Sequence, residues 1–124
     1  MLYAVLCYND ENAVSAWSKE EDDAVMARLA AVEDGMKKKG KLGPVARLLP
    51  TTSATTLRKA SGQPLIIDGP FAETKEQFLG FYMVDCETLD EAIAFAKDLA
   101  VANPQGGAYE IRPLAVYKPN HIGH

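Results

Sequence analysis

The stretch Phe78-Leu79-Gly80-Phe81-Tyr82-Met83-Val84-Asp85-Cys86 is almost wholly apolar. A continuous apolar run of this length is typical of a strand that is covered on both faces, whereas a half-exposed strand alternates apolar and polar residues. We therefore predict a central, doubly buried strand over residues 78–86. Other parts of the structure must cover each face of this strand.

Two amphipathic helices are predicted to cover the first face. Ser18 with Glu21, and Thr88 with Glu91, form capping boxes in which each side chain satisfies a free backbone N–H of the other residue. Each helix then carries an apolar stripe at helical spacing. The stripes are Val25, Leu29, Val32 and Met36 in a helix over residues 18–39, and Leu89, Ile93, Ala96 and Ala100 in a helix over residues 88–102.

Four further strands are predicted from short apolar or β-branched runs. Each run has turn-forming residues at its ends. They cover residues 2–8, 54–60, 64–68 and 109–117. The middle two form a hairpin around a Ser-Gly turn, and Pro113 indicates that the last strand ends early or lies at a sheet edge. Residues 41–53 are predicted as a loop with a short extended piece, and residues 71–77 as one helical turn.

This order of elements predicts an α+β fold. Without one short strand of the hairpin, the order is the ferredoxin-like βαββαβ pattern, which places two helices on one face of an antiparallel sheet. Because no third long helix is predicted to cover the other face, we expect a homodimer whose two sheets pack face to face. Residues 1–117 are predicted as a single domain and residues 118–124 as a C-terminal tail.

Composition excludes several classes of function. Of the 124 residues, 13 are Lys or Arg and 17 are Asp or Glu, which gives a formal net charge of −4. Direct binding to nucleic acid or to an anionic membrane needs a basic face and is therefore not expected. No apolar run reaches the ~18 residues of a membrane span, and the N-terminus reads as a strand rather than a signal peptide, so we expect a cytoplasmic protein. Cys7 and Cys86 stand outside any metal-binding spacing, and we expect buried thiols, no metal and no cofactor.

The decapeptide Asp68-Gly69-Pro70-Phe71-Ala72-Glu73-Thr74-Lys75-Glu76-Gln77 resembles the signature of the DGPF family, a branch of the YCII-related proteins. The resemblance continues through residues 3–8, 80–85, 90–92 and 110–114 and covers roughly residues 1–116. It implies a ferredoxin-like fold that pairs as a dimeric α+β barrel. It also implies an association with an extracytoplasmic-function sigma factor, through the genomic setting of family members, whereas the activity of the family is uncharacterised.

The acids of this motif are the candidate catalytic groups. Asp68 ends a predicted strand, where side chains can face a cleft, and Glu73 lies close to Lys75 and Glu76 in sequence. A partly buried carboxylate beside other acids can have its pKa raised toward that of a general acid or base. In the alternative, Asp68 caps the turn through its own backbone, and the other charges are solvated or paired across the dimer.

The candidate substrate-binding residues are Arg112, Lys75 and Tyr82. Arg112 can hold a carboxylate or phosphate through two parallel hydrogen bonds, and it shares a strand face with Glu110. Tyr82 lines an apolar pocket together with other aromatic residues. The alternatives are that Arg112 pairs with Asp68 or Glu73 and holds the loop in place, and that the aromatic residues belong to the core or the dimer interface.

The chain departs from its relatives at several positions. Some YCII-related proteins carry a His and Asp pair that looks catalytic, but the histidines of this chain, His121 and His124, both lie in the predicted tail. Asn103 stands where the relatives have an acid, and Leu79 stands where the family usually has Gly. Acid–base chemistry that depends on histidine is therefore not expected.

Two functions follow from these observations. In the first, the protein binds a small, aromatic or carbonyl-bearing molecule in a cleft between sheet and helices and transfers a proton, with Asp68 as acid or base. In the second, it is a non-catalytic interaction or regulatory protein that acts beside a sigma factor. The sequence leaves open whether the protein is an enzyme.

Overall fold

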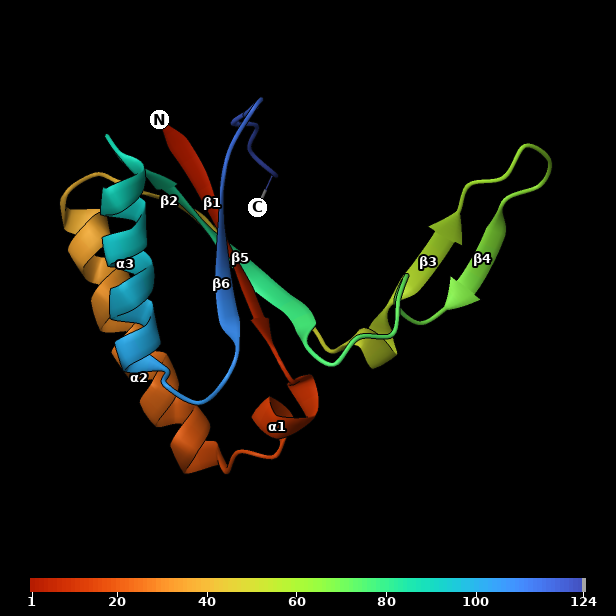
Figure 1. Ribbon diagram of the computed structural model, residues 1–124, viewed down its shortest axis with the longest axis horizontal. Helices are drawn as coiled ribbons and strands as arrows, with labels where there is room; N and C mark the ends of the chain where they lie inside the picture. The colour runs from red at the N-terminus through yellow and green to blue at the C-terminus, as the bar shows by residue number, and fades with distance from the viewer. Residues whose placement is uncertain (124) are drawn as a thin grey trace.

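The computed structural model describes residues 1–123, and His124 lies outside the described residues. Its body is a four-stranded antiparallel sheet with two long helices on one face (Figure 1). The strands are β1 (Leu2–Asn9), β2 (Leu42–Arg47), β5 (Gln77–Asp85) and β6 (Ala108–Pro113), in the order β2-β5-β1-β6. The helices are α2 (Lys19–Lys38) and α3 (Leu89–Ala102), preceded by the short α1 (Glu11–Ser15). This arrangement is compatible with the predicted ferredoxin-like α+β fold.

The two long helices begin where the capping residues predict. The Ser18 hydroxyl accepts a hydrogen bond from the Glu21 backbone N–H at 3.1 Å, and the Thr88 hydroxyl accepts one from the Glu91 N–H at 3.2 Å. Such caps satisfy N–H groups that have no partner within the helix, and each stabilises the helix by ~1 kcal/mol. Lys41 in addition forms an ion pair with Glu91, which ties the start of β2 to the first turn of α3.

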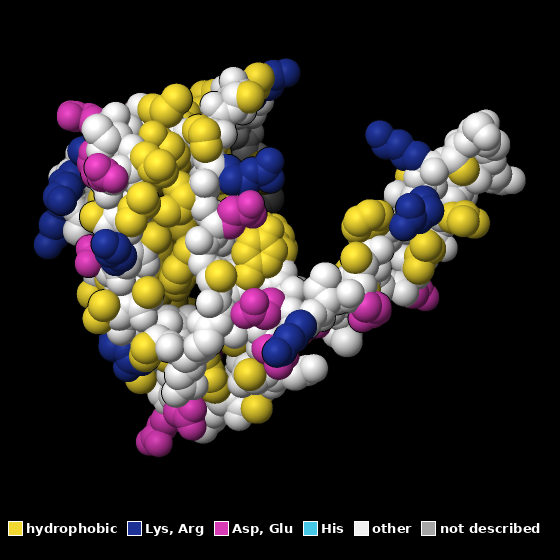
Figure 2. Space-filling model, viewed as in Figure 1, with side chains coloured by type: hydrophobic (Ala, Val, Ile, Leu, Met, Phe, Trp, Pro, Cys, Tyr) yellow, Lys and Arg dark blue, Asp and Glu magenta, His cyan; other side chains and the backbone are white. Residues whose placement is uncertain are grey.

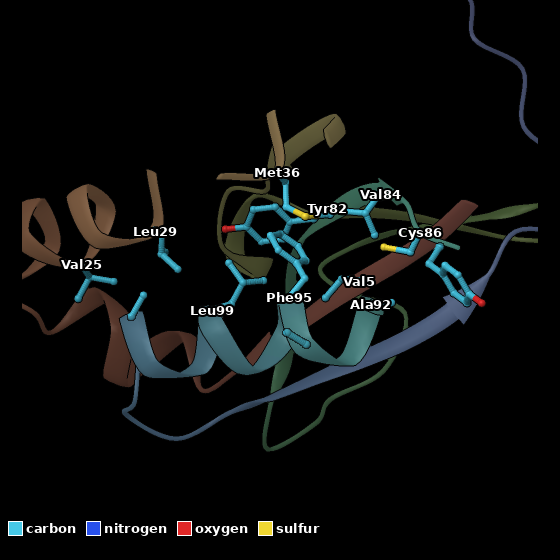
Figure 3. Packing of buried hydrophobic residues seen from close by; sticks show 13 residues of the cluster. Val5, Val25, Leu29, Met36, Tyr82, Val84, Cys86, Ala92, Phe95 and Leu99 are labelled. Atoms are coloured by element: carbon cyan, nitrogen blue, oxygen red, sulfur yellow. The ribbon is translucent and has the colours of Figure 1, made fainter. Parts of the chain in front are cut away.

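The hydrophobic core lies between the helices and one face of the sheet (Figure 3). Val5 of β1, Val84 of β5 and Leu99 of α3 are fully buried at its centre. Tyr82 packs edge-on against Phe95 of α3, with ring centroids 5.5 Å apart and an interplanar angle of 81°. Burying each such side chain contributes ~1.5–3 kcal/mol, so this single layer accounts for most of the packing energy.

The single chain covers only one face of strand 78–86, and the predicted cover of the other face by a second copy stays a prediction. In β5 only the helix-facing residues, such as Tyr82 and Val84, are buried. Phe81 and Met83 alternate with them, point to the opposite face and are half-buried, and Phe78 is 37% exposed. The physical reason is that both long helices pack on the same face. We call the other side the open face of the sheet.

The short extended piece predicted within residues 41–53 is edge strand β2 (Leu42–Arg47), and a 3₁₀ turn at Thr51–Ser53 follows it. Two other local features differ from the prediction. Residues 71–77 contain no helical turn. The sequence also did not predict α1, which is too short to show a periodic pattern. The boundary between a domain at 1–117 and a tail stays a prediction, although the last strand, β6, ends at the predicted proline and lies at the sheet edge.

The predicted hairpin is confirmed, but it lies outside the main sheet. Strands β3 (Thr55–Arg58) and β4 (Leu65–Asp68) pair only with each other and form a separate two-stranded sheet. Figure 1 shows this hairpin as an arm that stands away from the body. We call residues 55–68 the arm. Within residues 1–123, no helix is long and apolar enough to cross a membrane.

Gly80 is required by the close approach of β2 to β5. The pairing of β1 with β5 shifts register here, and a Cβ atom on Gly80 would lie 2.2 Å from the Ala46 carbonyl oxygen. A backbone atom at that distance cannot move aside without distorting the sheet. Leu79, which lies in the shifted segment, accepts a hydrogen bond from the Leu48 N–H through its carbonyl at 2.8 Å.

We therefore expect Gly80→Ala to lower the free energy of unfolding by ~1–3 kcal/mol, the usual cost of overpacking. The matched control is Gly35→Ala in α2, where an added Cβ meets nothing within 4 Å. That variant should gain up to ~1 kcal/mol, because alanine favours the helix. Urea unfolding at equal protein concentration measures both values, and a Gly80→Ala protein as stable as wild type would contradict this role.

Candidate functional site

A cavity of about 200 Å³ lies between the sheet and α2. Its walls come from α1, α2 and each strand of the main sheet, so the whole fold shapes it. The walls are mainly apolar and aromatic, which is typical of small-molecule sites. The apolar side chains include Trp17, Met26, Leu29, Val45 and Leu79, and the polar ones are Glu33, Arg47, Tyr82, Asn103 and Tyr109.

Glu33 brings a carboxyl group into this apolar surrounding. It lies one helical turn after Leu29 on α2 and is half-buried. Burial, and secondly the neighbouring charge of Asp34, raise the pKa of Glu33 above its ordinary value. A carboxyl group with a raised pKa exchanges a proton closer to neutral pH, which is the property of a general acid or base.

Two tyrosine hydroxyls face the same cavity. Burial raises the pKa of Tyr82, and the nearby charge of Glu33 raises it further. Burial also raises the pKa of Tyr109 to about 12. Both groups therefore stay protonated at neutral pH and can donate hydrogen bonds. In Figure 3 the Tyr82 hydroxyl points toward Leu29 of α2.

Asn103 presents a buried carbonyl oxygen that has no hydrogen-bond partner among residues 1–123. Its backbone ends α3, where the N–H donates to the Leu99 carbonyl at 2.9 Å. An unsatisfied buried acceptor costs ~1–3 kcal/mol, so a ligand or water that donates to this oxygen would be stabilised by the site. Asn103 is also one of the residues that line the cavity.

The loop after Asn103 is held by Asn9 at the end of β1. The Asn9 side chain is 8% exposed and donates to the Gln105 carbonyl at 3.0 Å. Gly107, with φ of +80°, lets this loop pass close to the end of β1. A Cβ atom added at Gly107 would lie 2.4 Å from the Tyr8 carbonyl oxygen. These contacts fix where α3 ends and hence where the Asn103 amide lies.

Arg47 places a positive charge on the solvent side of the cavity. Its guanidinium lies 3.5 Å from the Asp22 carboxylate and 3.4 Å from the Met26 sulfur, so it bridges the end of β2 to α2. The side chain is more than half exposed, which leaves it accessible to an anionic group entering the cavity. Arg47 therefore marks the mouth of the site.

The cysteine that lines the cavity is not a nucleophile. Burial raises the pKa of Cys7 to about 12, so the reactive thiolate is not populated at neutral pH. Cys86 is buried in the core, and neither cysteine forms a disulfide. Within residues 1–123, no three His, Cys, Asp or Glu side chains gather closely enough to hold a metal ion.

The residues predicted from the sequence fall in two separate places. Tyr82 lines the cavity. Asp68 ends β4 in the arm, and Glu73 and Lys75 follow it in an exposed segment. Arg112 lies on β6, where it alternates with the core-packed Ile111 and is therefore on the open face of the sheet, away from the helices.

The structure does not bring the predicted acids and Arg112 together within one chain. No ion pair joins Arg112 to Asp68 or Glu73 in the part of the chain that is described. Glu110 accepts a hydrogen bond from the Tyr8 hydroxyl at 3.4 Å. The catalytic and substrate-binding roles of these residues stay predictions.

Sequence reasoning missed most polar groups of the cavity. One signal for Glu33 was present, because Val25, Leu29 and Glu33 follow each other at intervals of four and place an acid beside the apolar stripe. Asn103 was noted only as the position where the relatives have an acid, not as a polar group of a cavity. No local pattern marks Arg47 or Tyr109 as partners of residues far away in sequence.

Comparisons with known proteins agree with the resemblance found in the sequence. The family model of the YCII-related domain matches residues 1–118. An uncharacterized protein of Rhizobium meliloti (strain 1021) is 64% identical to this chain over 122 residues, which cover 98% of each chain. Neither comparison names a substrate or a reaction.

The raised pKa of Glu33 predicts a pH-dependent effect of Glu33→Gln. Between the ordinary pKa of 4.5 and the raised value, the folded state binds this proton more tightly than the unfolded state, so the wild type loses stability as pH rises through this range. The Gln variant should therefore melt at a higher temperature than wild type at pH 7. This difference should disappear at pH 4, where both states of the wild type carry the proton.

Thermal melts monitored by circular dichroism at both pH values measure this difference. Glu20→Gln, on an exposed residue in the first turn of the same helix, is the matched control for losing one negative charge. A melting difference for Glu33→Gln that is the same at pH 7 and pH 4 would contradict the assignment.

Proposed function

The chain belongs to the YCII-related family, and we propose that it binds a small molecule in the cavity between the sheet and α2 and transfers a proton there. The observation that carries this proposal is the unpartnered Asn103 carbonyl, in a cavity that also holds a carboxyl group of raised pKa. A purely structural core would have no reason to keep both groups beside apolar walls.

The lining describes the class of ligand. A cavity of about 200 Å³ accommodates a molecule of the size of one substituted ring. Trp17, Tyr82 and Tyr109 offer aromatic surfaces for a planar molecule. The ligand carries a hydroxyl or amine that donates to Asn103, and a carbonyl or anionic oxygen that accepts from the tyrosine hydroxyls or from Arg47. Small hydroxylated aromatic or carbonyl compounds have these features.

The proposed chemistry is acid–base catalysis by Glu33. As an ionised base, Glu33 removes a proton from the ligand, and the pair of electrons left behind becomes a negative charge on the ligand oxygen. The hydroxyls of Tyr82 and Tyr109 and the guanidinium of Arg47 stabilise that charge. The neutral Glu33 acid then returns the proton at a second position, so the net reaction is an isomerisation with no cofactor.

We also propose that the protein assembles as a homodimer in the form of a dimeric α+β barrel. The open face carries half-buried or exposed apolar residues of both central strands, including Leu6, Phe78, Phe81 and Met83. Exposed apolar patches of this kind usually mark an interface. A second copy of the sheet, packed face to face, supplies the missing layer.

An alternative function is a non-catalytic interaction protein. The exposed apolar arm and the open face favour it, because both are surfaces for another protein. The resemblance to the DGPF family suggests an extracytoplasmic-function sigma factor as the partner. In this alternative the cavity binds a signal molecule without turnover, so ligand binding would still depend on Asn103.

The test of the cavity is a thermal-shift screen with small phenols and hydroxylated aromatic carboxylates. A ligand at ten times its dissociation constant stabilises the fold by ~1.4 kcal/mol, which corresponds to a melting shift of ~4 °C for a chain of this size. We expect Asn103→Leu to abolish the shift and Asp68→Asn, in the arm, to retain it. Loss of the shift in Asp68→Asn with retention in Asn103→Leu would contradict the proposed site.

Turnover is tested with a ligand from that screen. We expect Glu33→Gln to keep the thermal shift and to lose activity by ~10²-fold or more, the usual contribution of a general acid or base. Full activity of Glu33→Gln, followed by the spectrum of the ligand or by exchange of its protons with deuterated water, would contradict the catalytic role. Binding without turnover in the wild type would favour the interaction protein.

The proposed dimer is tested by sedimentation equilibrium. Phe78 packs against Tyr8 with ring centroids 5.6 Å apart on the open face. We expect a wild-type mass of two chains at micromolar concentration and dissociation in Phe78→Asp. Val101→Asp is the matched control, because Val101 is 79% exposed on α3 and far from the open face. A wild type with the mass of one chain would contradict the dimer.

A further inference from the structure

The arm has apolar side chains on both of its faces. The pairing of β3 with β4 puts Leu57 beside Ile66 on one face and Arg58 beside Leu65 on the other. Ile66 is 72% exposed and Leu57 and Leu65 are each 58% exposed. A strand that carries apolar residues on both faces is normally covered on both faces, and a lone two-stranded hairpin is only marginally stable in water. The arm is therefore a binding element that lacks its partner in the single chain.

A second apolar group lies beside the arm. Phe71, just after β4, is 72% exposed, and the Arg58 guanidinium lies 5.1 Å from its ring centroid. Ile67, on the same face of β4 as Leu65, is 41% exposed. Figure 2 shows hydrophobic side chains on both sides of the arm and an open hollow between the arm and the body.

The arm is held in its outward position at both of its roots. The Glu11 carboxylate of α1 accepts hydrogen bonds from the backbone N–H and the hydroxyl of Thr51, on the way into the arm. The Glu11 backbone N–H donates to the Gln77 side chain at 2.9 Å, on the way out. Gly69 closes the base, because its N–H donates to the Ala54 carbonyl at 2.8 Å.

These contacts hold the two segments that lead into and out of the arm, and the arm itself stands away from the sheet of its own chain (Figure 1). The arm and the open face form two walls of one hollow, and each wall exposes apolar residues that the same chain does not cover. The occupant must therefore bury both walls together.

We propose that the occupant is a second copy of this chain and that the arm is a clasp. By clasp we mean that the arm contacts the partner chain outside the face-to-face contact of the two sheets. This inference rests on the proposed dimer. A two-fold axis buries both walls of both copies at once, because every copy brings one open face and one arm. The clasp increases the interface without any further segment of the chain.

The charges around the hollow also fit a second copy. Glu110 and Arg112 give the open face a charge of each sign, and the segment after the arm also mixes both signs, with Glu73, Lys75 and Glu76. A surface of mixed sign is self-complementary, whereas a nucleic acid or a strongly acidic peptide would need a basic wall. In the dimer, the motif segment of one chain lies near the partner, and Asp68 or Glu73 pairs with the Arg112 that lacks a partner in its own chain.

The clasp is tested by sedimentation equilibrium of the Ile66→Asp variant. Val101→Asp is the control, because it also replaces an exposed apolar residue by an acid. Ile66 lies in a strand that pairs only with β3, so the body should fold normally, and far-UV circular dichroism confirms this. We expect the dissociation constant of the dimer to rise at least tenfold in Ile66→Asp and to stay within twofold in Val101→Asp. Glu11→Gln, which weakens the hold on Thr51, should raise the dissociation constant by a smaller factor.

The outcomes separate the clasp from the dimer itself. If Phe78→Asp dissociates the dimer and Ile66→Asp leaves its dissociation constant unchanged, the clasp is wrong and the face-to-face dimer stands. If the wild type has the mass of one chain, both are wrong, and the thermal-shift screen still decides the cavity independently. If Ile66→Asp dissociates the dimer and Val101→Asp does not, the clasp is supported.

Discussion

The rest of the structure depends on one constraint, which is that both long helices cover the same face of a single four-stranded sheet. The covered side collects the core around Val5, Val84 and Leu99, and it encloses the cavity where the packing of α2 against the strands is incomplete. The uncovered side keeps apolar residues in contact with solvent. The proposed ligand site and the proposed dimer interface thus lie on opposite faces of the same strands, and alternate residues of β5 belong to each.

The cavity combines groups that a well-packed core would avoid. A carboxyl group of raised pKa on α2 and a buried, unpartnered amide oxygen at the end of α3 each reduce the stability of the single chain. Both costs are offset when a ligand provides a hydrogen-bond donor and exchanges a proton. The chemistry that we propose for this site therefore rests on Glu33 and Asn103, while the charged motif after β4 lies in another part of the molecule.

The sequence predicted the elements that local physics determines. Capping by Ser18 and Thr88 located both helices, and the apolar run of β5 identified the central strand. It predicted only a short extended piece where β2 joins the main sheet, because Gly43 and Pro44 usually break strands and are tolerated here at a sheet edge. Most of the cavity was also beyond prediction, since its polar residues meet only through tertiary packing. Tyr82 is the one predicted binding residue that lines it.

The most direct test of the one-sided sheet is an isotope-filtered nuclear Overhauser experiment on an equal mixture of labelled and unlabelled chains. Contacts between copies then give signals that contacts within one chain cannot give. The account predicts intermolecular signals from the Met83 methyl group on the open face and from the Ile66 methyl groups of the arm, and none from Val101 on α3. Intermolecular signals from Val101 alone, or none from any of the three residues, would contradict it.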